Sequence, residues 1–274
     1  MGAQGDTNKV GFWGDGRRSV STPVLEPSVK VDHYEQMRNA LEVSATTLLK
    51  RVITKDLNAA VDQVEITGSF TLVATAQERA IRDVYREVFM TFATWQRNDL
   101  LASKRTKAED DDSKPWLALW GLWVLNFFLN SLFSKMRSIL STERRMINVI
   151  IDTGNRQGLT QNEIIAELRR KVPFIATSEA QRIARTEVTN AANAGAVQGA
   201  KSVGAKRKFW ITSKDERVRR GERGFNHAVM HEASVPMSEP FIVSGERLEH
   251  PGDGNNGASI GNLANCRCRL AFSI

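Results

Sequence analysis

SEAQRIARTEVTNAANAGAVQGAKSVG, residues 178–204, is rich in alanine and other small residues, which predicts a helix that can pack closely against its neighbours. Ser178 with Gln181 three residues later has the pattern of a capping box, and we expect the helix to begin there. Gly204 predicts its end. The segment therefore predicts a helix that packs tightly inside the protein.

Upstream of this segment the chain is also predicted to be helical. GLTQNEIIAELRR, residues 158–170, contains a capping box formed by Thr160 and Glu163. Apolar residues recur at helical spacing over about 32–54, and a further helix is expected to begin at a capping box of Thr75 and Glu78. A charged loop, KAEDDDSKP at 107–115, separates these helices from the next apolar segment.

The most apolar segment is WLALWGLWVLNFFLNSLF, residues 116–133, which has no charge in 18 residues. A membrane-spanning helix needs about 20 predominantly apolar residues, and Gly121, Asn126 and Asn130 dilute this one. We expect a central helix that is buried on nearly all sides or packs against a partner subunit. Insertion into a membrane is the less favoured alternative.

Beyond Gly204 the pattern changes to short β-prone runs separated by loops that contain Gly, Asn, Pro and Asp. These runs are KFWIT at 208–212, PFIV at 240–243 and RCRLAF at 267–272. The fold class is therefore α+β, with a predominantly helical N-terminal module followed by a small α/β C-terminal domain whose short sheet is mostly antiparallel. We expect a flexible arm over residues 1–30, the helical module over 31–155 and the C-terminal domain over 156–274.

The chain has 274 residues and a net charge of +7, and most of the excess lies between Lys201 and Arg223, with nine basic and three acidic residues. Phe209 and Trp210 interrupt this basic run, as aromatic residues do in proteins that bind single-stranded nucleic acid. Nonspecific contact with DNA phosphates is a plausible role. The candidate contact residues are Lys201, Lys206, Arg207, Lys208, Arg220 and Arg223.

The two cysteines exclude a disulfide scaffold, because Cys266 and Cys268 are only two positions apart and the N-terminus has no secretory signal, so a reducing compartment is expected. On a strand both thiols would lie on one face and Arg267 on the other. Zinc is the metal that such a pair could bind, with further ligands from His227, His231, His250 or Asp253. The alternative is that both cysteines are small buried residues without a metal, and no other cofactor is expected.

Catalysis is not expected. Asp215 with Arg217 and Arg219 could be a catalytic acid beside phosphate clamps, but no second carboxylate is close enough in sequence to hold a divalent ion. The run HAVMH at 227–231 lacks the glutamate that serves as base in HExxH sites. We expect instead an interlocked polar network that stabilises a small domain. Its candidate members are Arg185, Glu187, Asp215, Arg217, Arg219, Asp253, Asn265 and Arg267.

The order of these motifs resembles a known family. RTE at 185–187 is followed by Trp210, DxRxR at 215–219, a histidine, PF at 240–241, PGD at 251–253 and NCRC at 265–268. This order is similar to that of the head-morphogenesis domain of tailed bacteriophages, the minor head protein family typified by the F protein of phage Mu. The resemblance covers about residues 155–272. It departs from the family pattern where RGERGFN separates DxRxR from His227, so His231 is an alternative equivalent of the family's histidine.

The resemblance implies a minor capsid protein that is present in few copies at the portal vertex and the capsid interior, and that is needed for head assembly or genome packaging. It implies the portal protein and the major capsid or scaffold protein as partners, and no known enzyme activity. The protein would reside in the virion, and in the host cytoplasm during assembly. Two rivals remain: a metal-dependent hydrolase or toxin-like enzyme using Asp215, His227 and Cys266, and an ejected protein that enters the host membrane through residues 116–133.

Overall fold

The computed structural model describes residues 28–103, 115–221 and 224–274, with side chains from His33 onward. Most of the predicted arm and of the charged loop at 107–115 lies outside the described residues. The last three residues of the predicted arm, 28–30, belong to the first helix.

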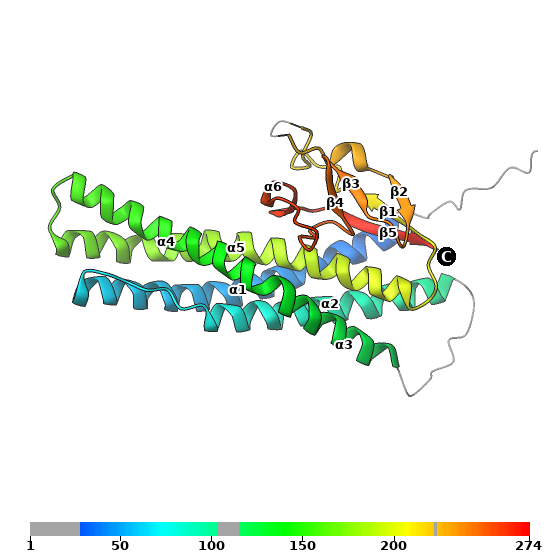
Figure 1. Ribbon diagram of the computed structural model, residues 1–274, viewed down its shortest axis with the longest axis horizontal. Helices are drawn as coiled ribbons and strands as arrows, with labels where there is room; N and C mark the ends of the chain where they lie inside the picture. The colour runs from blue at the N-terminus through cyan, green and yellow to red at the C-terminus, as the bar shows by residue number, and fades with distance from the viewer. Residues whose placement is uncertain (1–27, 104–114, 222–223) are drawn as a thin grey trace, which may run out of the picture.

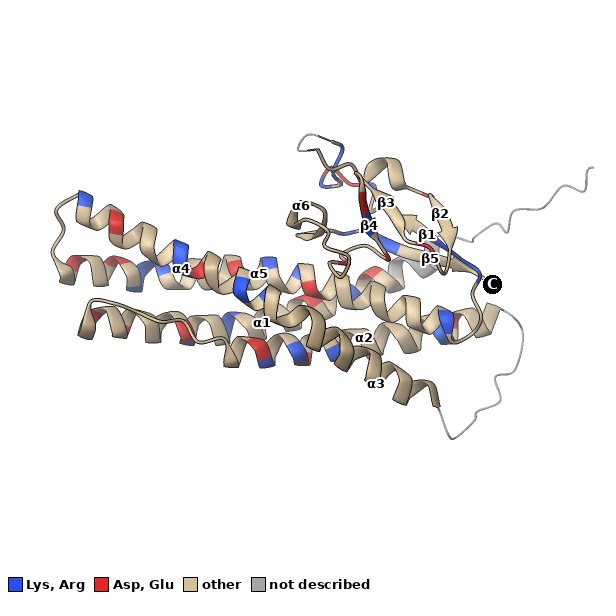
Figure 2. Cartoon of the chain, viewed as in Figure 1, with Lys and Arg blue, Asp and Glu red and all other residues tan. Residues whose placement is uncertain are grey.

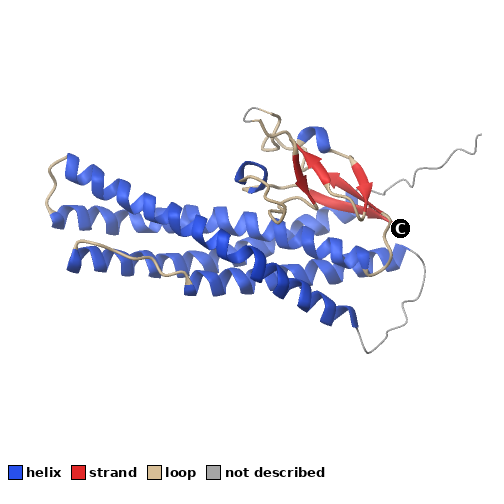
Figure 3. Ribbon diagram, viewed as in Figure 1, coloured by secondary structure: helices blue, strands red, loops and turns tan. Residues whose placement is uncertain are grey.

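Long helices that run nearly parallel form an elongated bundle, and a small group of strands covers one flank of it near one end (Figures 1 and 3). The predicted fold class is confirmed. The helices are α1 (Ser28–Thr67), α2 (Thr75–Ser103), α3 (Pro115–Phe127), the π-helical turn η1 (Phe128–Leu132), α4 (Phe133–Arg156) and α5 (Gln161–Lys201).

Helix α5 runs without interruption through the position where a new helix was expected to begin. Ser178 lies in mid-helix and its hydroxyl donates to the carbonyl of Ile175, so the predicted capping box at Ser178 is wrong. The predicted box at Thr160 is confirmed, because Glu163 accepts from the Thr160 backbone N–H at 2.7 Å and donates its own N–H to the Thr160 hydroxyl. Pro173 removes one backbone donor, but Val172 before it and Ala176 one turn later are buried in the core, so packing outweighs this loss.

The predicted capping box at the start of α2 is also absent. The backbone N–H of Glu78 donates to the carbonyl of Ala74, and the Glu78 carboxylate pairs with Arg82 one turn later at 2.7 Å. Helix α2 still begins at Thr75, as its apolar pattern predicts. Its start therefore depends on the buried apolar face rather than on a reciprocal cap.

The small residues of α5 allow the close packing that the sequence predicts. A Cβ atom on Gly195 would lie 2.3 Å from the carbonyl oxygen of Phe89 on α2. The alanines at positions 191, 192, 194, 196 and 200 are all buried. Helix α5 therefore lies with its backbone directly against α2, and it also packs along α1.

The apolar segment 116–133 is not buried on nearly all sides, which corrects the expectation for it. One face packs on α2, where Phe127 stacks on Tyr85 at 4.2 Å between ring centroids and Trp123 stacks on Phe89 at 4.9 Å. The other face is open because α3 lies on the outside of the bundle (Figure 1). The exposed face carries Leu119, Leu122, Leu125, Leu129 and Phe133, which are 51–72% exposed.

The continuous helical stretch Pro115–Arg156 is the one candidate membrane span in the described part of the chain. It qualifies by length and composition only, and 28% of its most apolar window is buried inside the protein. This is weak evidence for insertion, because a core helix of a soluble protein passes the same test.

The strands form two small antiparallel sheets. In the first, β1 (Arg207–Ile211) lies between β2 (Ser234–Pro236) and β5 (Arg269–Ser273), and in the second β3 (Phe241–Val243) pairs with β4 (Glu246–Leu248). The short helices η2 (Ala228–Met230) and α6 (Ile260–Leu263) lie in the connections. The predicted strand at 267–272 begins two residues later than expected, and β2 and β4 were not predicted.

The sheets pack on the last turns of α5, where Trp210, Phe241 and Leu270 contact buried small residues such as Ala196 and Ala200. Earlier turns of the same helix belong to the core of the bundle. Helix α5 is thus shared by the helical part and the β-containing part. The domain boundary near residue 155 stays a prediction.

Candidate metal centre

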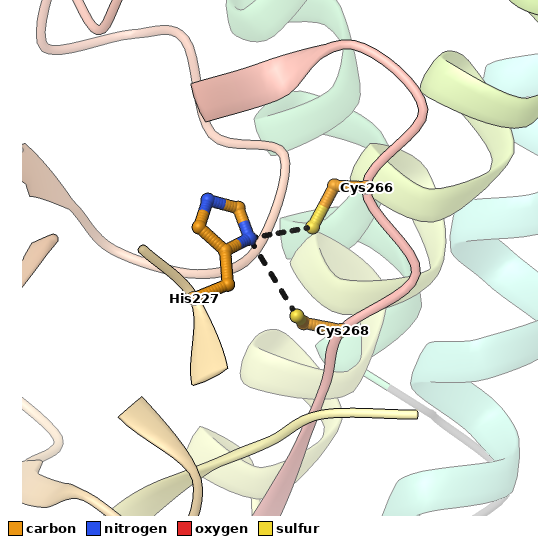
Figure 4. A group of neighbouring side chains, drawn as sticks. All are labelled: His227, Cys266 and Cys268. Carbon is orange, nitrogen blue, oxygen red and sulfur yellow. Dashed lines mark hydrogen bonds between the residues drawn. The ribbon is translucent and has the colours of Figure 1, made fainter. Parts of the chain in front are cut away.

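His227, Cys266 and Cys268 meet in the interior between the strands and α5 (Figure 4). His227 lies just before η2, and the cysteines lie in the loop that leads into β5. His227 Nδ1 is 3.6 Å from Cys266 Sγ and 3.7 Å from Cys268 Sγ, and each residue is at most 2% exposed. These three residues, called the His–Cys–Cys group below, could hold a metal ion.

The two thiols share one side of the chain, as the alternation of the sequence predicts. Cys266 and Cys268 are buried, whereas Arg267 and Arg269 between and beyond them are half-buried and line the opposite side. This alternation precedes the strand itself, which begins at Arg269. Because the backbone is extended here, both sulfurs lie on the same side of the chain and face the same histidine.

Asn262 of α6 fixes the orientation of the His227 ring. Its amide nitrogen donates to the Glu246 carboxylate at 2.7 Å and to the Val243 carbonyl at 3.1 Å, so its oxygen faces His227 Nε2 at 3.0 Å. Because an amide oxygen can only accept, we assign the ring proton to Nε2. The lone pair of Nδ1 is then left to face the sulfurs, as in a histidine that ligates metal.

Helix α5 holds the cysteine loop through two buried side chains. The Thr189 hydroxyl donates to the Cys266 carbonyl at 2.9 Å. The Asn193 amide donates to the Cys268 carbonyl at 3.0 Å and accepts the Leu270 N–H at 3.1 Å. The thiol positions are therefore set by hydrogen bonds to a long, well-packed helix.

Each of the two thiols changes the pKa of the other. The hydrogen bond from Cys268 holds the pKa of Cys266 well below its usual range even though burial acts in the opposite direction. The same hydrogen bond and burial raise the pKa of Cys268 well above its usual range. The first proton therefore leaves from Cys266, and the second is held at Cys268.

The other predicted ligands lie elsewhere, so the assignment of His231 to the metal set is wrong for this structure. His231 Nδ1 accepts the backbone N–H of Thr212 at 3.2 Å. Burial lowers the pKa of His250, whose ring contacts the Pro251 carbonyl. Asp253 accepts the backbone N–H groups of Glu249 and Asn255 and so stabilises a turn.

Several members of the predicted polar network meet around the NCRC segment. Arg185 donates to Asn265 Oδ1 at 3.3 Å, and Asp215 lies 3.6 Å from Arg267 and accepts the Arg217 backbone N–H at 3.0 Å. The Arg219 guanidinium donates to the Ala264 carbonyl. The network thus connects α5, the loop after β1 and the cysteine loop.

Glu187 and Asp253 do not join that cluster. Glu187 pairs with Lys135 of α4 at 2.6 Å. Sequence reasoning also missed two partners from the helical part: Glu42, which pairs with Arg185 at 3.0 Å, and Arg38, which donates to the Arg267 carbonyl at 3.1 Å. Nothing in the local sequence marks these residues, because their partners lie more than 140 positions away.

Lys208 is not a DNA contact residue. Its ammonium is fully buried, binds the carboxylate and carbonyl of Glu249 at 2.8 and 2.9 Å, and has a pKa lowered by burial. Lys201, Lys206, Arg207 and Arg220 are exposed, and Arg223 lies outside the described residues. Lys201 ends α5 and Arg207 begins β1, whereas Arg220 lies beyond the far end of β1, so the basic residues occupy separate places around the strands (Figure 2).

Comparison with known proteins agrees with the motif order. Residues 147–271 match the family described as Phage Mu protein F like protein. No curated protein and no solved structure matches the chain. Residues 147–271 of this chain therefore form a phage Mu protein F-like domain, of the family linked to phage head morphogenesis.

Proposed function

We propose that this protein is a minor head protein of a tailed bacteriophage, located at the portal vertex and facing the capsid interior, where it supports head assembly and genome packaging. The observation that carries the proposal is the match of residues 147–271 to the Mu F-like family. In this role the protein is made in the host cytoplasm and then resides in the virion.

The role is architectural rather than catalytic. The enzyme alternative requires Asp215, His227 and Cys266 to act together. Asp215 instead pairs with Arg267, whose side chain points away from the face that carries the two thiols. His227 and Cys266 are buried and have no open access for a substrate. The proposed role needs no catalytic cofactor.

The surface that we propose for the portal protein is the exposed apolar face of α3, η1 and the start of α4. Soluble monomers rarely expose large contiguous apolar patches, and such patches commonly mark protein interfaces. The five side chains named above are each more than half exposed and lie along one face of a continuous helical stretch. Burial of that surface against the portal protein would provide much of the binding free energy.

The test uses a phage that carries this gene. The copy in the phage genome is deleted, and each variant is supplied from a plasmid in the host. Leu122→Asp combined with Leu129→Asp should leave the protein folded and abolish its co-purification with the portal protein and its incorporation into heads. The matched control is Ile66→Asp, which replaces another exposed apolar side chain with a charged one, at the far end of α1 and away from the α3 face.

Two results would contradict this proposal. One is a virion that lacks the wild-type protein, and the other is a leucine double variant that enters heads as well as the control does. Protease protection of residues 116–133 by liposomes, seen with the wild type, would instead favour the membrane alternative.

A further inference from the structure

We propose that the His–Cys–Cys group binds one zinc ion through His227 Nδ1 and the sulfurs of Cys266 and Cys268, and that this ion clamps the loop before η2 to the loop before β5. The two loops are 39–41 positions apart in the sequence and belong to a region with a small apolar core. A bound metal is a common way to stabilise such a region.

The distances between the ligand atoms fit zinc. With Zn–S about 2.3 Å and Zn–N about 2.0–2.1 Å, a tetrahedral ion places a bound sulfur and nitrogen about 3.6 Å apart. The structure has 3.6 Å and 3.7 Å for the two sulfur–nitrogen pairs. The two sulfur–nitrogen distances are therefore at the spacing that an ion requires, and all three ligand atoms lie within 4.8 Å of one another.

The chemistry of the donors also fits. Two thiols and one imidazole are soft or borderline ligands, which favour zinc over magnesium or calcium. On binding, each thiol that still carries a proton releases it to solvent as its Zn–S bond forms, while His227 contributes the Nδ1 lone pair. The complex of one Zn²⁺ with two thiolates has no net charge, so burial does not leave an isolated charge in the interior.

Asn262 and Glu246 complete the arrangement as positioning residues. The Asn262 amide oxygen accepts a hydrogen bond from His227 Nε2–H, and Asn262 is itself held by the Glu246 carboxylate, which also accepts the Ser259 backbone N–H at 2.9 Å. Such outer partners fix the tautomer and the ring direction of metal-ligating histidines. In the metal-free protein a thiol S–H can donate to the Nδ1 lone pair, and a bound ion takes the place of that proton.

Among the described residues, the group contains no fourth His, Cys, Asp or Glu. Water can supply the remaining donor of a tetrahedral ion. Because all three ligands are nearly fully buried, the ion is shielded from bulk solvent, and its role is to hold the two loops together rather than to present a reactive water to a substrate.

The test is elemental analysis of the full-length protein, purified without a histidine tag and without chelator. We expect about one zinc per chain in the wild type, and less than a tenth of that in Cys266→Ser and Cys268→Ser. His231→Gln is the matched control and should keep its zinc, because His231 lies outside the group. Asn262→Leu should bind zinc about 10–100-fold more weakly in competition with a chromogenic chelator.

A second measurement uses only the wild-type protein, so the test stays valid if the cysteine variants do not fold. Cobalt added to the metal-free wild type should give the intense visible bands of tetrahedral Co²⁺ and the near-ultraviolet bands of thiolate-to-cobalt charge transfer. The proposal is overturned by wild-type protein that is folded and takes up neither metal. It is equally overturned by zinc that persists in both serine variants, or by copper or iron as the metal that co-purifies.

Discussion

A Cβ atom on Gly199 of α5 would lie 2.2 Å from the carbonyl oxygen of Ala93 on α2. Gly195, one turn earlier, is equally close to the backbone of the same helix. No side chain fits at that distance, and the neighbouring atoms are backbone atoms that cannot rotate away. The close contact between α5 and α2 therefore depends on glycine at both positions.

Gly199→Ala is expected to lower the free energy of unfolding by about 1–3 kcal/mol or more, because the two helices must move apart to admit the methyl group. Chemical denaturation of the purified protein measures the change. Gly121→Ala on α3 is the control, since nothing lies within 4 Å of the Cβ that it would add, and it should be neutral or stabilising by up to about 1 kcal/mol. Equal effects of the two substitutions would contradict the packing argument.

Glu143 is a buried carboxyl group inside the bundle. Its Oε2 accepts from Gln77 at 3.0 Å, and it faces Asp56 on α1 together with Glu179 and Arg182 on α5. Burial raises the pKa of Glu143 to about 7, and the two neighbouring carboxylates act in the same direction. The folded protein therefore holds this proton at pH values where an unfolded chain has lost it.

The direction of the pH effect follows from that difference. Below pH 4.5 both states hold the proton, and between pH 4.5 and about 7 only the folded state does, so stability falls as the pH rises through this range and then levels off. The loss from Glu143 alone is on the order of 3 kcal/mol. Glu143→Gln should remove most of this dependence and should be the more stable protein at pH 8.

Urea unfolding at pH 5 and pH 8 compares the two proteins. The raised pKa of Asp56 contributes a dependence of the same sign, which is common to both proteins and cancels in the comparison. Glu239→Gln, at an exposed position, should leave the wild-type dependence unchanged. The same slope in Glu143→Gln as in the wild type would show that this carboxyl group does not retain its proton.

Asn193 joins α5 to two separate segments of the C-terminal region. Asn193→Ala leaves the carbonyl of Cys268 and the N–H of Leu270 buried without their partner, as well as the carbonyl of Pro251, to which the same amide donates at 3.2 Å. Unsatisfied buried groups cost about 1–3 kcal/mol each, and partial relaxation makes a total loss of about 2–4 kcal/mol the expected result. Thermal unfolding measures it.

Gln198→Ala on the same helix is the control for Asn193→Ala, because Gln198 is only half-buried, and it should change the stability by less than about 1 kcal/mol. A loss confined to the helical signal, with native hydrogen exchange at Cys268 and Leu270, would contradict the anchoring role of Asn193. Slowly exchanging amides in β5 that become fast in Asn193→Ala would support it.

Patterns of short range were sufficient for much of this structure. Three sequence patterns depend only on residues close together in the chain, and each predicted the correct local arrangement. They are the apolar period of α2, the small residues of α5 and the alternation of Cys266 with Arg267. The pairing of the cysteines with His227, rather than with His231, depends on a fold contact over about 40 positions. Sequence spacing alone left that choice open.

Other features were missed because tertiary packing outweighs local signals. Pro173 and the pattern at Ser178 both suggest a break, but the core on either side keeps α5 continuous. Lys208 lies in a basic run that suggests solvent exposure, but its position on the central strand of a three-stranded sheet buries it. No local pattern marks Asn262, whose importance comes from three partners in other segments, His227, Glu246 and Val243.

The exposed cations near the end of α5 provide a test of DNA contact. Lys201, Lys206 and Arg207 are exposed at one end of the sheet, so each could neutralise a phosphate. When the logarithm of the binding constant is plotted against the logarithm of the salt concentration, each neutralised phosphate of duplex DNA contributes about 0.9 to the magnitude of the slope. Replacing all three with glutamine should therefore reduce the slope by up to about 3 and weaken binding to every sequence alike.

The matched control replaces three exposed cations of the helical bundle, Lys50, Arg51 and Arg144, with glutamine, which gives the same loss of net charge. If binding depends on local contact, the control keeps a salt slope close to that of the wild type, as fluorescence anisotropy with a labelled duplex would measure. If both triple variants lose binding equally, the net charge of the protein accounts for the attraction and these three residues form no DNA site. Lys208→Gln belongs to neither group: the loss of a buried partner of Glu249 should appear as reduced stability, with the salt slope unchanged.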